Sequence, residues 1–267
     1  MAKYYDEIPE SLIEWIKKQH MFWVASAPLN PDGHVNVSPK GTADCFHVVN
    51  SRRVWYQDLS GSGVETISHI RENGRVTIML NAFEGPPRIL RLYGIGTVHE
   101  YGTPEYESLI PPETRKPGSR AAIVIDVYQC QTSCGFAVPI YDFATHRTQL
   151  IRSMHMKESC DRASDATAST ELDKRGLKAY WIQKNLRSVD GLPGLLTAPD
   201  SKVTPVSVFD KEGPRPKLHR PSSRDGNALS SGATVGISFV LGALAATILP
   251  RILSDIRKFG MFTDTTT

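Results

Sequence analysis

Short runs of alternating apolar and polar residues recur along the first half of the chain, a pattern typical of half-buried β-strands. Turn-forming residues separate these runs, for example the Pro, Asn, Asp and Gly within residues 28–33. Many short strands at even spacing, without long helices between them, favour a closed or partly closed β-barrel over a parallel doubly wound sheet. The expected strands span residues 22–26, 34–38, 46–49, 54–56, 76–80, 89–100 and 121–127.

Three other segments carry apolar residues at helical spacing, so the predicted fold class is mainly β with flanking helices (α+β). These segments are residues 8–18, 63–73 and 171–187. Ser62 and Glu65 have the spacing of a capping box at the start of the second helix. Gly74 suits the left-handed position that ends it.

The corner formed by residues 54–66 is the first candidate for chemistry. A strand leads into a Gly/Ser-rich turn, and the turn leads into the start of a helix. Backbone N–H groups at a helix start lack intrahelical partners, and the helix dipole there favours negative charge, so the corner suits a phosphate. The hydroxyls of Ser60, Ser62 and Thr66 would add donors. An ordinary strand–turn–helix corner explains the same pattern equally well.

Composition narrows the class of protein. The chain has 267 residues, 40% hydrophobic and 22% charged, which is enough to bury a sizeable core. The net charge of +3 is small and spread out, so no nucleic-acid partner is expected. The first residues lack the apolar core of a signal peptide. The four cysteines have no metal-ligand spacing, so we expect free thiols and no metal.

The end of the chain changes character. Residues 198–227 are polar and rich in proline, which predicts a flexible linker. Residues 228–249 contain no charged side chain and are long enough to span a membrane. We therefore expect a transmembrane tail anchor that leaves the preceding domain on the cytoplasmic face of an intracellular membrane, followed by a short polar tail at 250–267. A buried soluble helix or an unstructured Ala/Gly tail is the alternative.

Five segments, in order along the chain, carry a resemblance to a known family: residues 34–41, 56–66, 85–94, 131–136 and 188–194. They resemble segments of the pyridoxamine 5′-phosphate oxidase-like flavoproteins, a family of FMN-binding split barrels. The resemblance covers roughly residues 5–195 and points to a subgroup distinct from the true pyridoxamine phosphate oxidases.

The resemblance implies a six-stranded split β-barrel over residues 1–197 and a homodimer with FMN in a groove at its interface. It also implies an FMN-dependent oxidoreductase that moves two electrons to or from a small molecule. Because the flavin carries such chemistry, no protein nucleophile is needed, and no catalytic residue is assigned. The implied cofactor contacts are Val37, Ser38, Lys40, Tyr56, Asp58, Ser60, Ser62, Gly63, Thr66, Arg88 and Arg91. Cys134, Asn185 and Asp190 are further candidates near the flavin.

The chain departs from the true oxidases at three places. Val35 stands where they carry an arginine, residues 61–66 replace their Ser-Arg-Lys phosphate triplet, and no C-terminal Arg-x-His motif is present. Oxidation of vitamin B6 is therefore not expected, and the substrate stays open.

The sequence also allows three alternatives to an FMN enzyme. The same barrel could use the deazaflavin F420. It could bind haem or a flavin without catalysis, with His34 or His47 as a ligand in the case of haem. It could also be a membrane-tethered interaction module that binds no cofactor.

Overall fold

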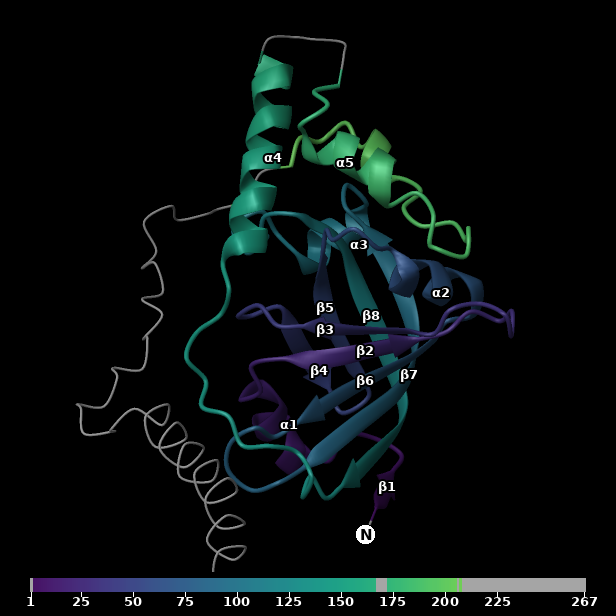
Figure 1. Ribbon diagram of the computed structural model, residues 1–267, viewed down its shortest axis with the longest axis vertical. Coiled ribbons are helices and arrows are strands. Elements are labelled where there is room, and N and C mark those ends of the chain that lie inside the picture. The colour runs from purple at the N-terminus through teal and green to yellow at the C-terminus, as the bar shows by residue number, and fades with distance from the viewer. Residues whose placement is uncertain (1, 167–171, 206, 208–267) are drawn as a thin grey trace, which may run out of the picture. The chain divides into compact units, whose positions relative to one another are not determined.

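A computed structural model of the chain describes residues 2–166, 172–205 and 207. Eight strands form one antiparallel sheet (Figure 1). Its order is β3-β2-β6-β7-β8-β5-β4, and β1 pairs with β8 beside this path. The strands are β1 (Lys3–Tyr5), β2 (Phe22–Ser26), β3 (Asn36–Lys40), β4 (Phe46–Asn50), β5 (Arg53–Leu59), β6 (Arg75–Asn81), β7 (Ile89–Glu100) and β8 (Ser119–Ser133).

The architecture confirms a mainly β fold with flanking helices, consistent with a split barrel, but the predicted strand number was wrong. The sheet has eight strands rather than six, and its path is open between β3 and β4. The three residues of β1, which pair with Thr132, Gln131 and Cys130, are too few to give an alternating pattern in the sequence. A register shift between Tyr93 and Gly94 marks a bulge in β7.

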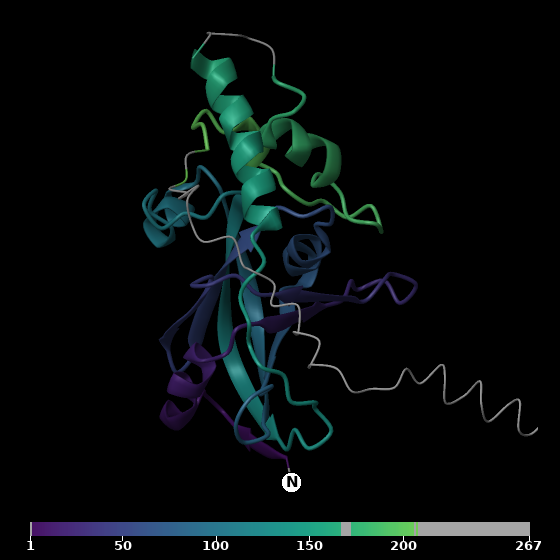
Figure 2. The same ribbon diagram turned by 60° about the vertical axis from the view of Figure 1, so that its left-hand side comes forward.

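Within the described part of the chain, five helices and a short 3-10 turn flank the sheet. Both views place α4 and α5 at one end of the sheet and α1 at the other (Figures 1 and 2). They are α1 (Glu10–Lys17), α2 (Glu65–Asn73), α3 (Pro104–Leu109), α4 (Gln149–Ala166), α5 (Leu177–Lys184) and η1 (Ala198–Asp200).

The two ends of α2 show one prediction confirmed and one corrected. Gly74 adopts φ 73° at the C-terminus, as predicted. The capping box is wrong, because the N-cap is Val64 and no side chain caps the helix. The Glu65 carboxylate lies instead over Gly63, where a Cβ atom would come within 2.2 Å of Glu65 Oε2.

The sequence did not predict α4, and it placed one long helix at 171–187 where only α5 is found. Met154, Glu158 and Asp161 are the buried residues of α4, so two of its three buried side chains are acids and the apolar periodicity is lost. Leu172, an apolar residue of the segment predicted to be helical, is exposed.

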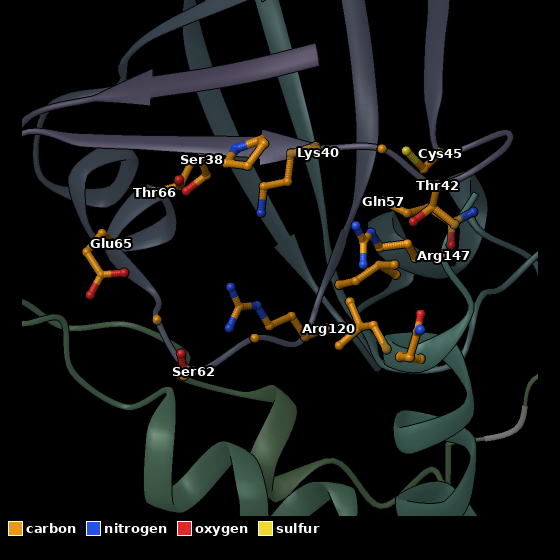
Figure 3. A pocket seen from close by; sticks show the side chains of 17 residues that line it. Ser38, Lys40, Thr42, Cys45, Gln57, Ser62, Glu65, Thr66, Arg120 and Arg147 are labelled. Atoms are coloured by element: carbon orange, nitrogen blue, oxygen red, sulfur yellow. The ribbon is translucent and has the colours of Figure 1, made fainter. Parts of the chain in front are cut away.

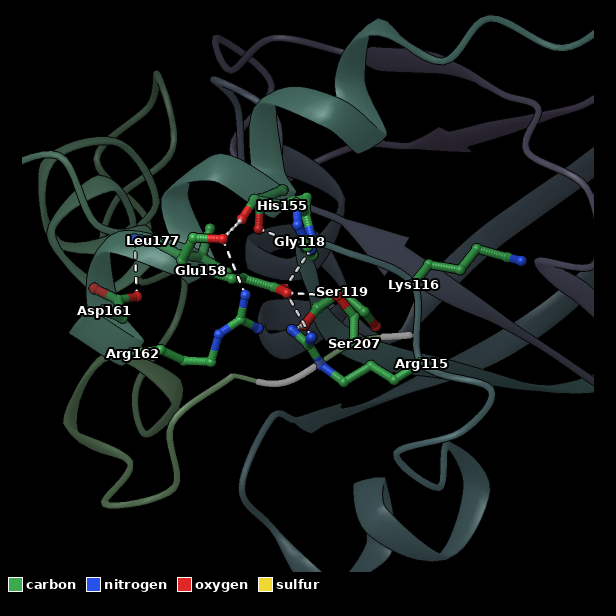
Figure 4. Close-up of polar contacts among 12 residues, drawn as sticks. Arg115, Lys116, Gly118, Ser119, His155, Glu158, Asp161, Arg162, Leu177 and Ser207 are labelled. Carbon is green, nitrogen blue, oxygen red and sulfur yellow. Dashed lines mark hydrogen bonds and ion pairs between the residues drawn. The ribbon is translucent and has the colours of Figure 1, made fainter. Parts of the chain in front are cut away.

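Buried polar contacts attach α4 to the sheet (Figure 4). Glu158 Oε1 accepts hydrogen bonds from Arg115 Nη1 at 2.7 Å and from the Gly118 amide at 2.8 Å. Glu158 Oε2 accepts from Ser207 Oγ at 2.6 Å. Asp161 Oδ2 accepts from the Leu177 amide at 2.9 Å, which joins α4 to α5. The turn before β8, which includes Gly118, is thereby fixed in place.

The connection from β8 to α4 has no regular secondary structure. Residues 134–148, here called the strap, run from the far end of β8 back along the sheet to α4 (Figures 1 and 2). Their backbone is held at few points, among them a 3.0 Å hydrogen bond from the Tyr141 amide to the Phe83 carbonyl.

The predicted tail lies mostly outside the described residues. Ala198 and Pro199 are buried, so packed structure continues into the first residues of the expected linker. The expected membrane anchor at 228–249 falls wholly outside the described part of the chain. Within that part, no helix is both long and apolar enough to cross a bilayer.

Candidate functional site

A hollow of about 810 Å³ opens beside the strand–turn–helix corner (Figure 3). Its walls come from the end of β3, the turn after β5, the start of α2, the start of β8 and the end of the strap. This volume lies in the range of small-molecule and cofactor sites. Five predicted cofactor contacts line it: Ser38, Lys40, Ser62, Gly63 and Thr66.

A fully buried carboxylate organises the positive charge of the hollow. Asp58 Oδ1 accepts a 2.7 Å hydrogen bond from Lys40 Nζ, and Asp58 Oδ2 accepts one of 2.8 Å from Arg120 Nε. Asp58 is 0% exposed. Burial alone would raise the pKa of Asp58, but the charges of Arg120 and Lys40 outweigh it and hold that pKa at about 2. Two cations therefore share one anion, which leaves one positive charge over.

The Arg120 guanidinium has a hydrogen-bond donor that no described residue uses. The side chain lines the hollow, and the residue is only 3% exposed. Its buried Nη1 has no hydrogen-bond partner among the described residues. A buried donor without a partner costs free energy, so this geometry favours an acceptor that comes from a ligand. Figure 3 shows the guanidinium reaching into the space between Lys40 and Ser62.

The pairing of β3 with β2 sets which of its side chains face the hollow. Ser38 lies opposite Val24, and Lys40 lies opposite Phe22, so both share the face of these buried residues. Val37 points to the other face and is 58% exposed. Thr66 Oγ1 accepts a 3.0 Å hydrogen bond from Asn36 Nδ2, which ties α2 to β3 at the rim.

Hydrogen bonds from distant parts of the chain hold the turn after β5 in place. Ser60 Oγ donates to the Gly118 carbonyl at 2.7 Å and accepts from Trp181 Nε1 at 2.7 Å. Asn185 Nδ2 donates to the Gly61 carbonyl at 3.0 Å. Ser60 and Asn185 therefore support the corner from within the core. Tyr56 of β5 is also fully buried, and its neighbour Gln57 lines the hollow.

The turn after β5 also carries backbone amide groups that bear on ligand binding. Among the described contacts, no acceptor takes a hydrogen bond from the amides of Ser62, Gly63 or Glu65. The Glu65 carboxylate also stands at the rim, with Oε1 accepting a 3.4 Å hydrogen bond from the Val189 amide. The corner thus offers free donors together with one negative charge that opposes an anion.

The remaining predicted contacts lie elsewhere in this chain. Arg88 packs over the Trp15 ring at 5.4 Å, and Arg91 Nη1 contacts Ser133 Oγ at 3.4 Å. Neither arginine lines the hollow. Cys134 is exposed. Asp190 Oδ1 contacts His34 Nδ1 at 2.7 Å, and this pairing lowers the pKa of Asp190.

Sequence reasoning missed two basic residues of the hollow, Arg120 and Arg147. Arg120 begins an apolar strand and meets Asp58 from 62 positions away, so no local motif marks it. Arg147 lies on the irregular strap, where no periodicity predicts its direction.

Comparison with known proteins identifies the family. A family model described as pyridoxamine 5′-phosphate oxidase matches residues 8–134. A pyridoxamine 5′-phosphate oxidase family protein of Aspergillus flavus, ustO, is 39% identical over 201 residues, which cover 74% of this chain and 80% of that relative. The chain belongs to the pyridoxamine 5′-phosphate oxidase family.

Solved structures with similar folds are more distant. HupZ of Group A Streptococcus shares 20% identity over 45% of this chain and 89% of its own, with a TM-score of 0.37. An FAD-binding protein of Mesorhizobium loti shares 10% identity over 50% of this chain and 99% of its own, with a TM-score of 0.33.

Proposed function

We propose that this chain binds FMN and acts as an oxidoreductase that transfers two electrons to or from a small molecule. The observation that carries the proposal is the Arg120 side chain, which lines a hollow of nucleotide size and has a buried Nη1 without a hydrogen-bond partner among the described residues. Membership of the pyridoxamine 5′-phosphate oxidase family supports a flavin as the ligand.

The donor set of the hollow fits a phosphate monoester. Lys40 and Arg120 offer charge-assisted hydrogen bonds, and Asp58 cancels only one of their two charges. The amides of Ser62 and Gly63 and the hydroxyl of Ser62 add neutral donors at the start of α2. A neutral ligand would leave both the charge and the donors without partners.

A bound flavin would supply the hydride chemistry. The residues of the chain would bind and orient it: Lys40 and Arg120 hold the phosphate, while Asp58 fixes both cations in position. Since Asp58 and Arg120 are buried, they need little rearrangement when the anion arrives. No side chain of the corner is required as a nucleophile.

We further propose that the active form is a homodimer. Val35 and Val37 on the outer face of the edge strand β3 and its preceding loop are exposed, as a dimer surface would require. Light scattering of the purified protein tests this state, and a monomeric mass at working concentration would contradict it.

Absorption spectroscopy of the purified full-length protein, with mass identification of any copurified molecule, tests the cofactor. We expect a flavin spectrum and the mass of FMN. A Soret band would identify haem instead, and the mass of F420 would identify a deazaflavin. A protein without chromophore that also fails to bind added FMN would contradict the proposed function.

A further inference from the structure

Arg147 is a cation at the edge of the first hollow. Its side chain lines the hollow, and Figure 3 shows its guanidinium pointing inward from the side of Gln57 and Thr42. No hydrogen bond or ion pair joins it to another residue that the structure describes. Lys40 and Arg120, by contrast, are both anchored on Asp58.

Aromatic packing fixes the strap just before Arg147. The Phe143 ring stacks on His20 with 3.6 Å between centroids and 12° between planes. His146 packs edge-on against Phe143 at 4.8 Å. The Phe143 amide donates to Glu84 Oε1 at 2.7 Å. An otherwise irregular segment is thereby held where it delivers Arg147 to the site.

A second hollow, of about 630 Å³, adjoins the first and shares Arg147 with it. Thr42 and Gln57 also line both spaces, so Arg147 stands at their common boundary. His47 and Trp55 line the second hollow and stack on each other, with centroids 3.9 Å apart and planes 15° apart. This stacked aromatic pair and Arg147 line the same hollow.

The other charged groups of the second hollow come from two loops. Lys116 and Glu113 lie on the loop before β8, and Asp44 lies on the loop before β4. Arg115 also lines the space but pairs with Glu158. Burial, followed by the charge of Lys116, lowers the pKa of His47, so this imidazole is neutral at neutral pH. The cations Lys116 and Arg147 are the groups suited to an acid.

We propose that Arg147 binds the carboxylate of a small aromatic acid whose ring lies in the second hollow beside Trp55 and His47. The proposed binding of the acid depends only on these residues and does not require a flavin. Its role as the substrate of the flavin enzyme rests on the proposed function, because the two hollows meet at Arg147. Because the strap carries Arg147, it is the element that selects acids over neutral or cationic ligands in this proposal.

Benzoate is the probe, and the tryptophan fluorescence of full-length protein is the readout. We expect saturable quenching by benzoate, which weakens by about tenfold or more in Arg147→Gln and is partly restored in Arg147→Lys. Trp55→Phe should remove most of the quenching signal. Arg175→Gln, which changes an exposed arginine paired with Asp173, is the matched control and should bind benzoate as the unaltered protein does.

Benzylamine, which has the same ring and the opposite charge, separates acid recognition from simple apolar binding. Equal affinity for benzylamine and benzoate, no saturable benzoate binding, or unchanged binding in Arg147→Gln would overturn the proposal. FMN affinity is measured in parallel. If Arg147→Gln weakens FMN and leaves benzoate unchanged, Arg147 belongs to the cofactor site. If benzoate binds as expected and FMN does not bind at all, the proposed function fails while this inference stands.

Discussion

Arg120 donates a 2.8 Å hydrogen bond from Nε to Asp58 Oδ2, and both side chains are almost completely buried. This contact joins the start of β8 to the end of β5 and directs the rest of the guanidinium into the hollow. A buried carboxylate thus serves both the fold and the site. It neutralises part of the positive charge while leaving donors free for an anion.

Replacing Asp58 with asparagine should destabilise the fold by about 3–5 kcal/mol, because two cations would lose their shared buried anion. Urea unfolding measures this loss. Asp126→Asn is the matched control, since it breaks the exposed Arg53–Asp126 pair of 2.6 Å and should cost less than about 1 kcal/mol. Equal effects of the two substitutions would show that Asp58 is not an organising charge.

The same carboxylate should give the fold a specific acid sensitivity. The pKa of Asp58 is about 2 in the folded chain, below the value of about 3.9 for an unfolded aspartate. The folded state therefore holds its proton less tightly, and the stabilisation is complete above about pH 4 and lost as pH falls toward 2. The difference in unfolding free energy between the native protein and Asp58→Asn should shrink over that interval. A constant difference from pH 5 to pH 2 would contradict the account.

Removing Lys40 should weaken FMN without weakening riboflavin. Lys40→Ala deletes one charge-assisted contact to the phosphate, worth roughly 1.5–3 kcal/mol, while Asp58 keeps Arg120 as its partner. Titration of flavin fluorescence gives both affinities. If the variant binds FMN as the native protein does, Lys40 has no part in the site.

Removing the charge of Glu65 should strengthen FMN binding, whereas removing Lys40 should weaken it. Its carboxylate stands at the rim of the hollow near Gly63, where it repels a phosphate. Glu65→Gln keeps the shape of the side chain and removes the charge, so FMN affinity should rise by a few fold at low salt. The gain should shrink as salt screens the charges. Weaker binding of FMN would mean that Glu65 supports the ligand rather than opposing it.

The uncharged segment at 228–249 predicts membrane association on sequence grounds alone. Deleting residues 228–267 should move the protein from the membrane fraction to the soluble fraction without loss of flavin. Cell fractionation of the two forms measures the change. Recovery of the full-length protein in the soluble fraction would refute the anchor.

Local sequence patterns predicted most strands, the end of α2 and one wall of the hollow. Alternation located most strands, Gly74 ended α2 as expected, and the Gly/Ser turn with Lys40 marked one wall of the hollow. These features depend on residues close together in the sequence, where spacing and backbone preference are informative.

Long-range contacts decided the rest. The sequence gives no sign that Arg120 meets Asp58, or that Trp181 and Asn185 support the turn at Ser60 and Gly61. Helix α4 escaped notice because its buried face carries Glu158 and Asp161 in place of apolar residues. Such contacts emerge only once the sheet has brought distant segments together.

The affinities of the full-length protein for FMN and for riboflavin test the central claim most directly, because the two ligands differ only in the phosphate. Two charge-assisted contacts predict that FMN binds about 100-fold more tightly or better, and that Arg120→Gln removes much of this difference. Equal affinity for the two ligands would contradict a phosphate-binding site formed by Lys40, Arg120 and the turn after β5.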